Sequence, residues 1–201
     1  MFPIYKACDE AGLPICLHVG GAEFGVNSGS YSSGSPSTFC EYHFGMCIPA
    51  IQHLVSMVTE GVFVRFPNMR LVMNEFGVAW LPFVMWRLDM EYRASRIDVP
   101  WLTKLPSEYI KEFVRFTTQP VEEPPDRRDL ATLLSLVGGD DLLLFSSDYP
   151  HWDSDNPDWA LRFFPDDWKP KICWENAREL YRLDERLSAL SDDNALLQQP
   201  A

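Results

Sequence analysis

Two residues able to do chemistry follow short apolar runs of this chain. His18 comes after residues 14–17, and Asp148 comes after the apolar run 142–145. In α/β barrels and open α/β sheets, ligands and catalytic groups collect where buried parallel strands end and loops begin. An imidazole and a carboxylate at two such ends could bind one metal ion or share acid/base chemistry. Two ligands do not complete a metal site, so further ligands must come from elsewhere.

Two more residues could belong to the same site. His151 lies three residues after Asp148 and could contact a substrate there, although it could equally be an ordinary loop histidine. Glu75 ends another apolar run, where a buried carboxylate needs a partner. It either pairs with one of the arginines Arg65, Arg70 and Arg115 or takes a ligand or acid/base role. Asp148 itself could instead cap the turn that follows it.

Other candidates carry weaker signals. His18 precedes a Gly/Ser-rich segment, residues 20–38, and loops of that length are usually lids or disordered. His43 lies close enough to this segment to line a pocket, whereas His53 is expected to be structural. Asp153 and Asp155 could suggest a second metal, but exposed loop carboxylates explain them better.

Alternating patterns predict a parallel α/β fold. Strands are expected at residues 14–19, 70–75, 112–117 and 141–147, and helices at 2–11, 46–60, 80–96, 126–138 and 168–182. We expect Trp80, Phe83 and Trp86 to pack between their helix and the sheet. Residues 1–187 should form one partial barrel of about four β/α units, and residues 188–201 a flexible tail. A complete barrel needs eight such units.

Charge and composition narrow the possible partners. Seventeen Lys and Arg against 29 Asp and Glu give a net charge of −12, which argues against nucleic acid or an anionic membrane as partner. No stretch approaches the length of a transmembrane helix, and no secretory signal is visible. Five cysteines without a CxxC pair suggest reduced, mostly buried thiols in a cytoplasmic protein.

Four separate blocks, in order along the chain, carry a family resemblance. They are Gly12-Leu13-Pro14-Ile15-Cys16-Leu17-His18, residues 63–89 with Glu75-Phe76-Gly77, Ser147-Asp148-Tyr149-Pro150-His151-Trp152-Asp153, and Asn176-Ala177-Arg178-Glu179-Leu180-Tyr181. Together they resemble the amidohydrolase-related family that includes aminocarboxymuconate-semialdehyde decarboxylase and related aromatic-acid decarboxylases. The resemblance runs from about residue 2 to residue 183.

The resemblance implies a metal-dependent (β/α)₈ barrel of which this chain corresponds to strands five to eight. It makes His18 the fifth-strand metal ligand and Asp148 the eighth-strand ligand. The implied ion is Zn²⁺ first and Mn²⁺ second. The His-x-His pair of the family's first strand does not occur in these residues. Several of the decarboxylases have a histidine at the end of the sixth strand, where this sequence has Glu75.

Three functions follow as alternatives. The first is a metal-dependent hydrolase or carboxy-lyase for a small carboxylated or cyclic substrate, with His18 and Asp148 on the metal and Asp148, His151 and Glu75 as catalytic residues. The second is an incompetent half-barrel that needs an oligomer or a complementing N-terminal half. The third is an unrelated α/β binding module, which would be favoured if neither His18 nor Asp148 faced a pocket.

Overall fold

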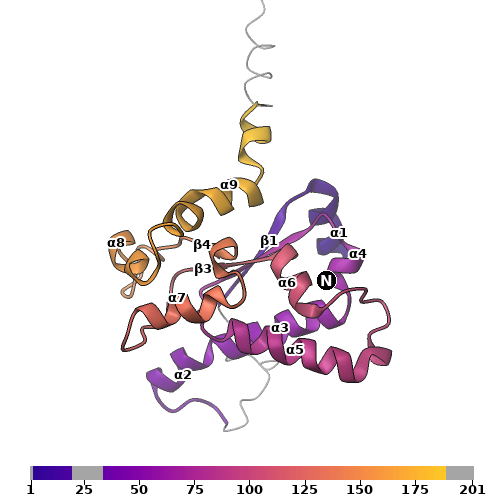
Figure 1. The fold of residues 1–201 in the computed structure, drawn as a ribbon, viewed down its shortest axis with the longest axis horizontal. Helices are drawn as coiled ribbons and strands as arrows, with labels where there is room; N and C mark the ends of the chain where they lie inside the picture. The colour runs from indigo at the N-terminus through magenta and orange to yellow at the C-terminus, as the bar shows by residue number, and fades with distance from the viewer. Residues whose placement is uncertain (1, 20–33, 189–201) are drawn as a thin grey trace, which may run out of the picture.

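The computed structural model describes residues 2–19 and 34–188 and contains a four-stranded parallel sheet (Figure 1). Its strands are β1 (Pro14–His18), β2 (Arg70–Asn74), β3 (Val114–Thr117) and β4 (Leu143–Leu144), in the order β1-β2-β3-β4. Because each strand pairs in parallel with the next one along the chain, all four carboxyl ends lie at the same edge of the sheet. The expected architecture of about four β/α units is confirmed.

The strands form where short apolar runs are buried. Leu71, Val72 and Met73 of β2 are all at most 2% exposed, as expected for a strand covered on both faces. All four strands are shorter than predicted, β1 and β2 by one residue and β3 and β4 by more. Strand β3 starts at Val114 because helix α6 continues to Phe113. Strand β4 has two residues because a 3₁₀ turn precedes it and the Phe145 N–H bonds to the carbonyl of Ile172 instead of continuing the ladder.

Helices connect the strands, and all the expected ones are present. In the described residues the labelled α-helices are α1 (Phe2–Ala11), α2 (Phe39–Gly45), α3 (Cys47–Thr59), α4 (Val62–Arg65), α5 (Leu81–Ser95), α6 (Pro106–Phe113), α7 (Arg128–Ser135), α8 (Pro157–Ala160) and α9 (Asn176–Leu180), and residues 183–188 are also helical. Short 3₁₀ turns lie at Arg96–Asp98, Gly139–Asp141 and Leu161–Phe163, and a π-helical turn, Lys171–Glu175, leads into α9. The pattern did not predict α2, α4, α6 and α8, which are at most eight residues long.

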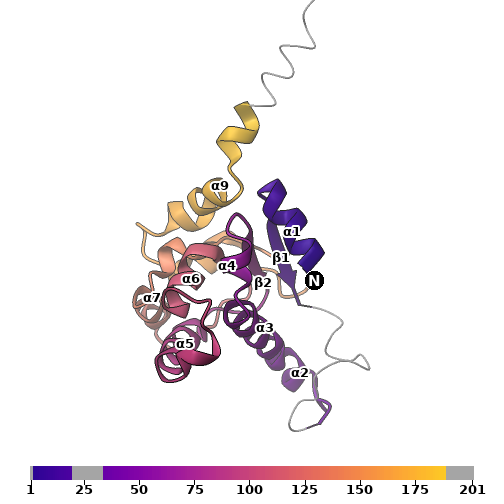
Figure 2. The same ribbon diagram turned by 90° about the vertical axis from the view of Figure 1, so that its right-hand side faces the viewer.

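The two faces of the sheet are covered very differently. One face, with Leu71 and Phe116, packs against the large core that includes Leu54 of α3 and Met85 of α5. The other face carries a small separate cluster of Val72, Leu144 and Leu180. Figure 2 shows α1 beside β1 at one edge of the sheet, while α3 and α5 lie to one side of it. Most of the hydrophobic core therefore lies on one face of the sheet, between the sheet and the helices that follow β1, β2 and β3.

Two sequence-based expectations about burial were wrong. Phe83 and Trp86 are 65% and 51% exposed, so only Trp80 of that aromatic cluster packs inward, against Phe116. They lie on the solvent side of α5 because Leu81, Val84, Met85 and Leu88 already form its buried stripe. The cysteines are all free, but none is fully buried, and Cys16, Cys40 and Cys173 are exposed.

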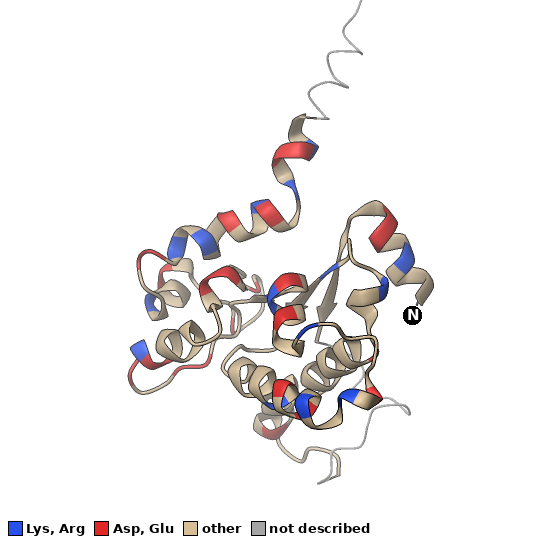
Figure 3. Ribbon diagram, turned by 45° about the vertical axis from the view of Figure 1, so that its right-hand side comes forward, with Lys and Arg blue, Asp and Glu red and all other residues tan. Residues whose placement is uncertain are grey.

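Acidic and basic residues are interspersed along the helices (Figure 3). Within the described ranges, no helix has both the length and the apolar character needed to cross a membrane. Residues 189–201, which make up the predicted tail after Ser188, lie outside the described residues. Residues 20–33 of the predicted lid also lie outside them.

Candidate metal centre

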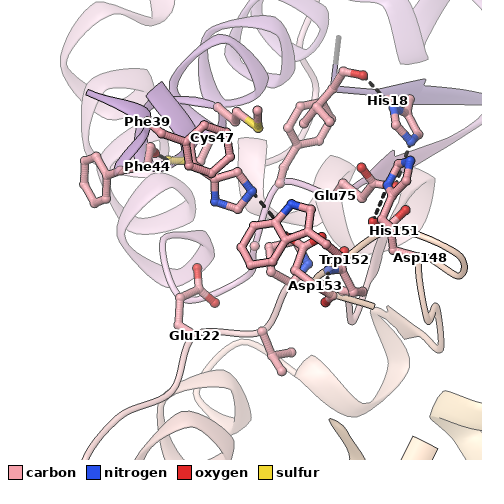
Figure 4. Close-up of a pocket in the computed structure, with 18 residues that line it drawn as sticks. His18, Phe39, Phe44, Cys47, Glu75, Glu122, Asp148, His151, Trp152 and Asp153 are labelled. Carbon is pink, nitrogen blue, oxygen red and sulfur yellow. Dashed lines mark hydrogen bonds and ion pairs between the residues drawn. The ribbon is translucent and has the colours of Figure 1, made fainter. Parts of the chain in front are cut away.

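The four predicted site residues come together at the carboxyl edge of the sheet. His18 is the last residue of β1, Glu75 directly follows β2, and Asp148 and His151 lie in the loop after β4. All four line a cavity of about 570 Å³ (Figure 4). Since both His18 and Asp148 face this pocket, the condition that would have favoured an unrelated binding module is not met.

The backbone is unusual at the two acidic residues of this group. Glu75 has φ 66° and Asp148 has φ 56°, and one other non-glycine residue of the described chain, Arg182, has a positive φ. Non-glycine residues adopt this left-handed region at a cost of about 1–3 kcal/mol, and such residues cluster at functional sites. Both of these residues line the cavity.

Glu75, Asp148 and His151 form a set with the spacing of metal ligands. One ligand atom from each lies within 4.8 Å of the others, and no other such cluster of His, Cys, Asp or Glu exists in residues 2–19 and 34–188. Protein ligands of a divalent ion sit roughly 2.0–2.6 Å from it, so groups this close can share one ion after small rotations.

Two hydrogen bonds tie the four residues into pairs. His18 Nε2 lies 2.7 Å from Oε1 of Glu75, and His151 Nδ1 lies 2.6 Å from Oδ2 of Asp148. The other ring nitrogen of His18 lies 2.5 Å from the carbonyl oxygen of Val19. The predicted metal pair, His18 and Asp148, is thus brought together with Glu75 between them. His18 is not a member of the three-residue cluster, but its Nε2 is hydrogen-bonded to Glu75, which is.

The carboxylates of Glu75 and Asp148 make the centre favourable for a cation. Burial, together with hydrogen bonding and repulsion from Asp148, raises the pKa of Glu75 above its usual value, against the attraction of His18. Burial lowers the pKa of His18, but the bond to Val19 and the negative charge of Glu75 outweigh burial, so that this pKa is raised. No lysine or arginine occurs among the described residues that line the cavity. The donor set therefore fits a divalent metal ion, whose charge would offset the two carboxylates.

The arginine pairing considered for Glu75 is not what the structure shows. The Arg70 guanidinium donates to the carbonyls of Pro67 and Met69, and the Arg115 guanidinium donates to those of Lys111 and Val114. Arg65 stacks over the rings of Phe2 and Phe66. His18 takes the place of an arginine as the partner of Glu75.

The opposite wall of the cavity is aromatic. The ring of Phe39 stacks on His43 with centroids 5.4 Å apart, and Trp152 lies 6.2 Å from each of them. His43 lines the pocket, as the sequence suggested. Its Nε2 lies 3.5 Å from Oδ2 of Asp153. Asp153 and Asp155 are not part of a metal-ligand cluster in the described chain.

Several pocket residues carried no usable signal in the sequence. Phe39 and Trp152 are apolar residues in segments without periodicity, and Glu122 lies in a loop rich in proline and acid. Both carboxylate oxygens of Glu122 accept from the Val78 N–H, at 3.1 and 3.0 Å, and one of them also accepts from Ala79. These two N–H groups lie just before helix α5, where a carboxylate is favourable. Glu122 is more than forty residues further along the chain, so the sequence does not show that the two belong together.

Comparison with known proteins identifies the family. Residues 2–183 match the amidohydrolase family. The chain belongs to that family. It is similar in structure to 5-carboxyvanillate decarboxylase from Sphingomonas paucimobilis (TM-score 0.63, 22% identity, 90% of this chain and 52% of that one). It is also similar to 2,6-dihydroxybenzoate decarboxylase from Rhizobium (TM-score 0.63, 21% identity, 90% and 55%).

A third similar structure contains a metal. It is dihydroxybenzoic acid decarboxylase from Polaromonas sp. JS666 with bound manganese and the inhibitor 2-nitroresorcinol (TM-score 0.59, 20% identity, 91% of this chain and 54% of that one). The amidohydrolase chain described here thus spans about half the length of the solved structures that it matches. Its four-stranded parallel sheet is part of a barrel, as expected.

Proposed function

We propose that this amidohydrolase chain carries one half of the active site of a metal-dependent hydrolase or decarboxylase. The observation that carries the proposal is the convergence of Glu75, Asp148 and His151, with His18 bonded to Glu75, in a pocket whose described lining has no basic side chain other than histidine. The substrate is a small organic molecule that is carboxylated or cyclic. The names of the similar proteins, which act on carboxylated aromatic rings, favour an aromatic carboxylate and decarboxylation.

The residues have distinct roles in this proposal. His18 and Asp148 bind the metal ion, with Glu75 close enough to join them. A bound divalent ion supplies Lewis-acid chemistry and water activated near neutral pH. Asp148 accepts a proton, and His151, hydrogen-bonded to it, passes a proton to or from the substrate. The sequence favours Zn²⁺, whereas the manganese in the Polaromonas enzyme makes Mn²⁺ an equal candidate.

A second candidate is that the chain is inactive alone and works with a partner. Its coverage of about half of each matched structure supports this alternative, because the two proposed metal ligands, His18 and Asp148, do not complete a metal site. We propose that a second copy or a complementing N-terminal half provides the missing ligands. The five unpaired thiols support a cytoplasmic location.

Metal content tests the proposal directly. The purified chain is equilibrated with Zn²⁺ or Mn²⁺, desalted and subjected to elemental analysis beside His18→Ala, Asp148→Asn and the control Asp153→Asn. Asp153 is a carboxylate of the same pocket that lies outside the ligand cluster. We expect near-stoichiometric metal in the parent and the control, and little in the other two variants. A parent chain without metal would contradict the proposal.

Decarboxylation then separates the two candidates. The metal-loaded chain is assayed with 2,6-dihydroxybenzoate and 5-carboxyvanillate, following release of carbon dioxide. Turnover that is lost in Asp148→Asn supports an active half-barrel. Metal binding without turnover supports the partner-dependent alternative.

A further inference from the structure

Strand β3 provides none of the four site side chains, yet its carboxyl end contacts the loops on both sides. Thr117, Thr118 and Gln119 follow one another there and are 6%, 0% and 2% exposed. Buried polar side chains need hydrogen-bond partners, and these partners show what the three residues hold.

Thr117 holds the loop after β2. Its Oγ1 accepts a hydrogen bond from the backbone N–H of Glu75 at 3.1 Å and lies 3.5 Å from the Gln119 carbonyl, to which it can donate. Glu75 is the residue with φ 66° whose carboxylate bonds to His18. The hydroxyl therefore fixes the backbone at the point where the chain takes its strained turn into the cavity.

Thr118 holds the loop after β4. Its Oγ1 accepts from the Ser146 N–H at 3.1 Å and donates to the Ser146 carbonyl at 3.3 Å. Ser146 lies two residues before Asp148, which has φ 56°. On the other side of Asp148, Gln119 Nε2 donates to the carbonyl of Asp153 at 3.1 Å. The segment that carries Asp148 and His151 is thus hydrogen-bonded at both of its ends to the two residues that follow β3.

We propose that Thr117 and Thr118 are positioning residues of the metal centre, which fix Glu75 and Asp148 at the spacing that a shared ion requires. The inference rests on the proposed function for the existence of a metal ion at this site. Two buried threonines that merely stabilised the sheet would bond to strand backbone. These two instead bond to the residues at, or just before, the two acidic positions with left-handed backbone. Such strain persists where surrounding groups over-determine it.

The test compares Thr117→Val and Thr118→Val with Thr117→Ser and Thr118→Ser. Valine keeps the shape of threonine and removes the hydroxyl, whereas serine keeps the hydroxyl. Mn²⁺ affinity is measured by calorimetric titration of the full chain. We expect each valine variant to bind Mn²⁺ about 10–100-fold more weakly, as is typical for residues that orient metal ligands, and each serine variant to keep the parent affinity. Val114→Ala, at the amino end of β3, is the control for lost stability without a lost hydroxyl.

Amide hydrogen exchange without metal gives a second measurement. Thr117→Val should speed exchange in residues 75–78, and Thr118→Val in residues 146–149, with the rest of the sheet unchanged. Parent-like Mn²⁺ affinity in both valine variants would overturn the proposal, and so would exchange that is unchanged in these loops or faster across the whole sheet. If the parent chain takes up no metal, the proposed function fails, while local exchange still decides whether the threonines position the loops.

Discussion

The partner of Glu75 in the structure differs from the one that the sequence suggested. A buried carboxylate needs a partner, and arginines are frequent nearby in the sequence, but the structure pairs Glu75 with His18 at 2.7 Å. Strand direction explains the difference. Arg70 begins β2 and Glu75 follows its end, so five extended residues separate the two by about 16 Å. A histidine at the carboxyl end of the neighbouring strand is much nearer, since His18 pairs with Asn74 in the register.

The turn that carries Glu75 also depends on Gly77, which gives a first prediction at this scale. Gly77 has φ 69°, and a Cβ there would lie 2.4 Å from Oε1 of Glu122. The Glu122 side chain could swing away only by giving up its bonds to the N–H groups of Val78 and Ala79. We expect Gly77→Ala to lower the free energy of unfolding by about 2–4 kcal/mol, from backbone strain plus the lost hydrogen bonds. Urea denaturation measures the change.

Gly138→Ala is the matched control for this variant. Gly138 has φ 75°, but a Cβ there meets nothing within 4 Å, so the substitution adds strain without a collision. Its cost should be about 1 kcal/mol. Gly77→Ala should also weaken Mn²⁺ binding, while Gly138→Ala should not. Equal costs in the two variants would mean that Glu122 does not hold this turn.

At the scale of elements, the sequence predicted helices and strands well where periodicity was long and poorly where it was short. The stripe of Leu81, Val84, Met85, Leu88 and Tyr92 identified α5 correctly. By contrast, α6 was not predicted, and its last residues, Glu112 and Phe113, were assigned to the strand expected at 112–117. Helix α2 and the aromatic wall could not be predicted, since contacts such as Phe39 with Trp152 join segments over a hundred residues apart.

The meeting of the four candidate residues at one edge of the sheet could be predicted, because His18 and Glu75 stand at strand ends and Asp148 and His151 lie in the loop that follows β4. What the sequence could not give was their pairing, which depends on strand register and on the left-handed turns at Glu75 and Asp148. The roles of Thr117, Thr118 and Gln119 were equally invisible. Their function comes from two neighbouring loops and not from any pattern of their own.

Asn176 connects helix α9 to strand β4 by a side-chain hydrogen bond. Its Nδ2 donates to the carbonyls of Asp140 and Leu143, at 2.7 and 2.8 Å, and the residue is 7% exposed. Asn176→Ala leaves both carbonyls without this donor, so the free energy of unfolding should fall by about 2–3 kcal/mol. Thermal and urea unfolding measure the change. Asn68→Ala, at an exposed loop position, should alter stability by less than about 0.5 kcal/mol, and a similarly small effect at Asn176 would show that the bond is dispensable.

At the scale of the whole molecule, the sheet has an edge that the described chain does not cover. β1 is the first strand in the order and pairs only with β2 in the described ranges. Leu13 and Cys16 on this edge are exposed. An uncovered edge strand presents unpaired backbone groups to any other chain that can add a strand. The matched structures are about twice as long as this chain.

We therefore expect the chain to associate with itself through β1 when no complementing half is present. Sedimentation velocity over a range of protein concentrations, with a reducing agent to keep Cys16 free, should show a larger species at high concentration. Cys16→Lys places a charge on the edge strand and should leave the monomer at every concentration, because a lysine there must be desolvated before another strand can pair. Ile97→Lys, at a residue that is 87% exposed after α5, is the control and should associate like the parent. A parent chain that stays monomeric throughout would show that a second copy does not cover β1, which leaves a complementing N-terminal half as the source of the missing ligands.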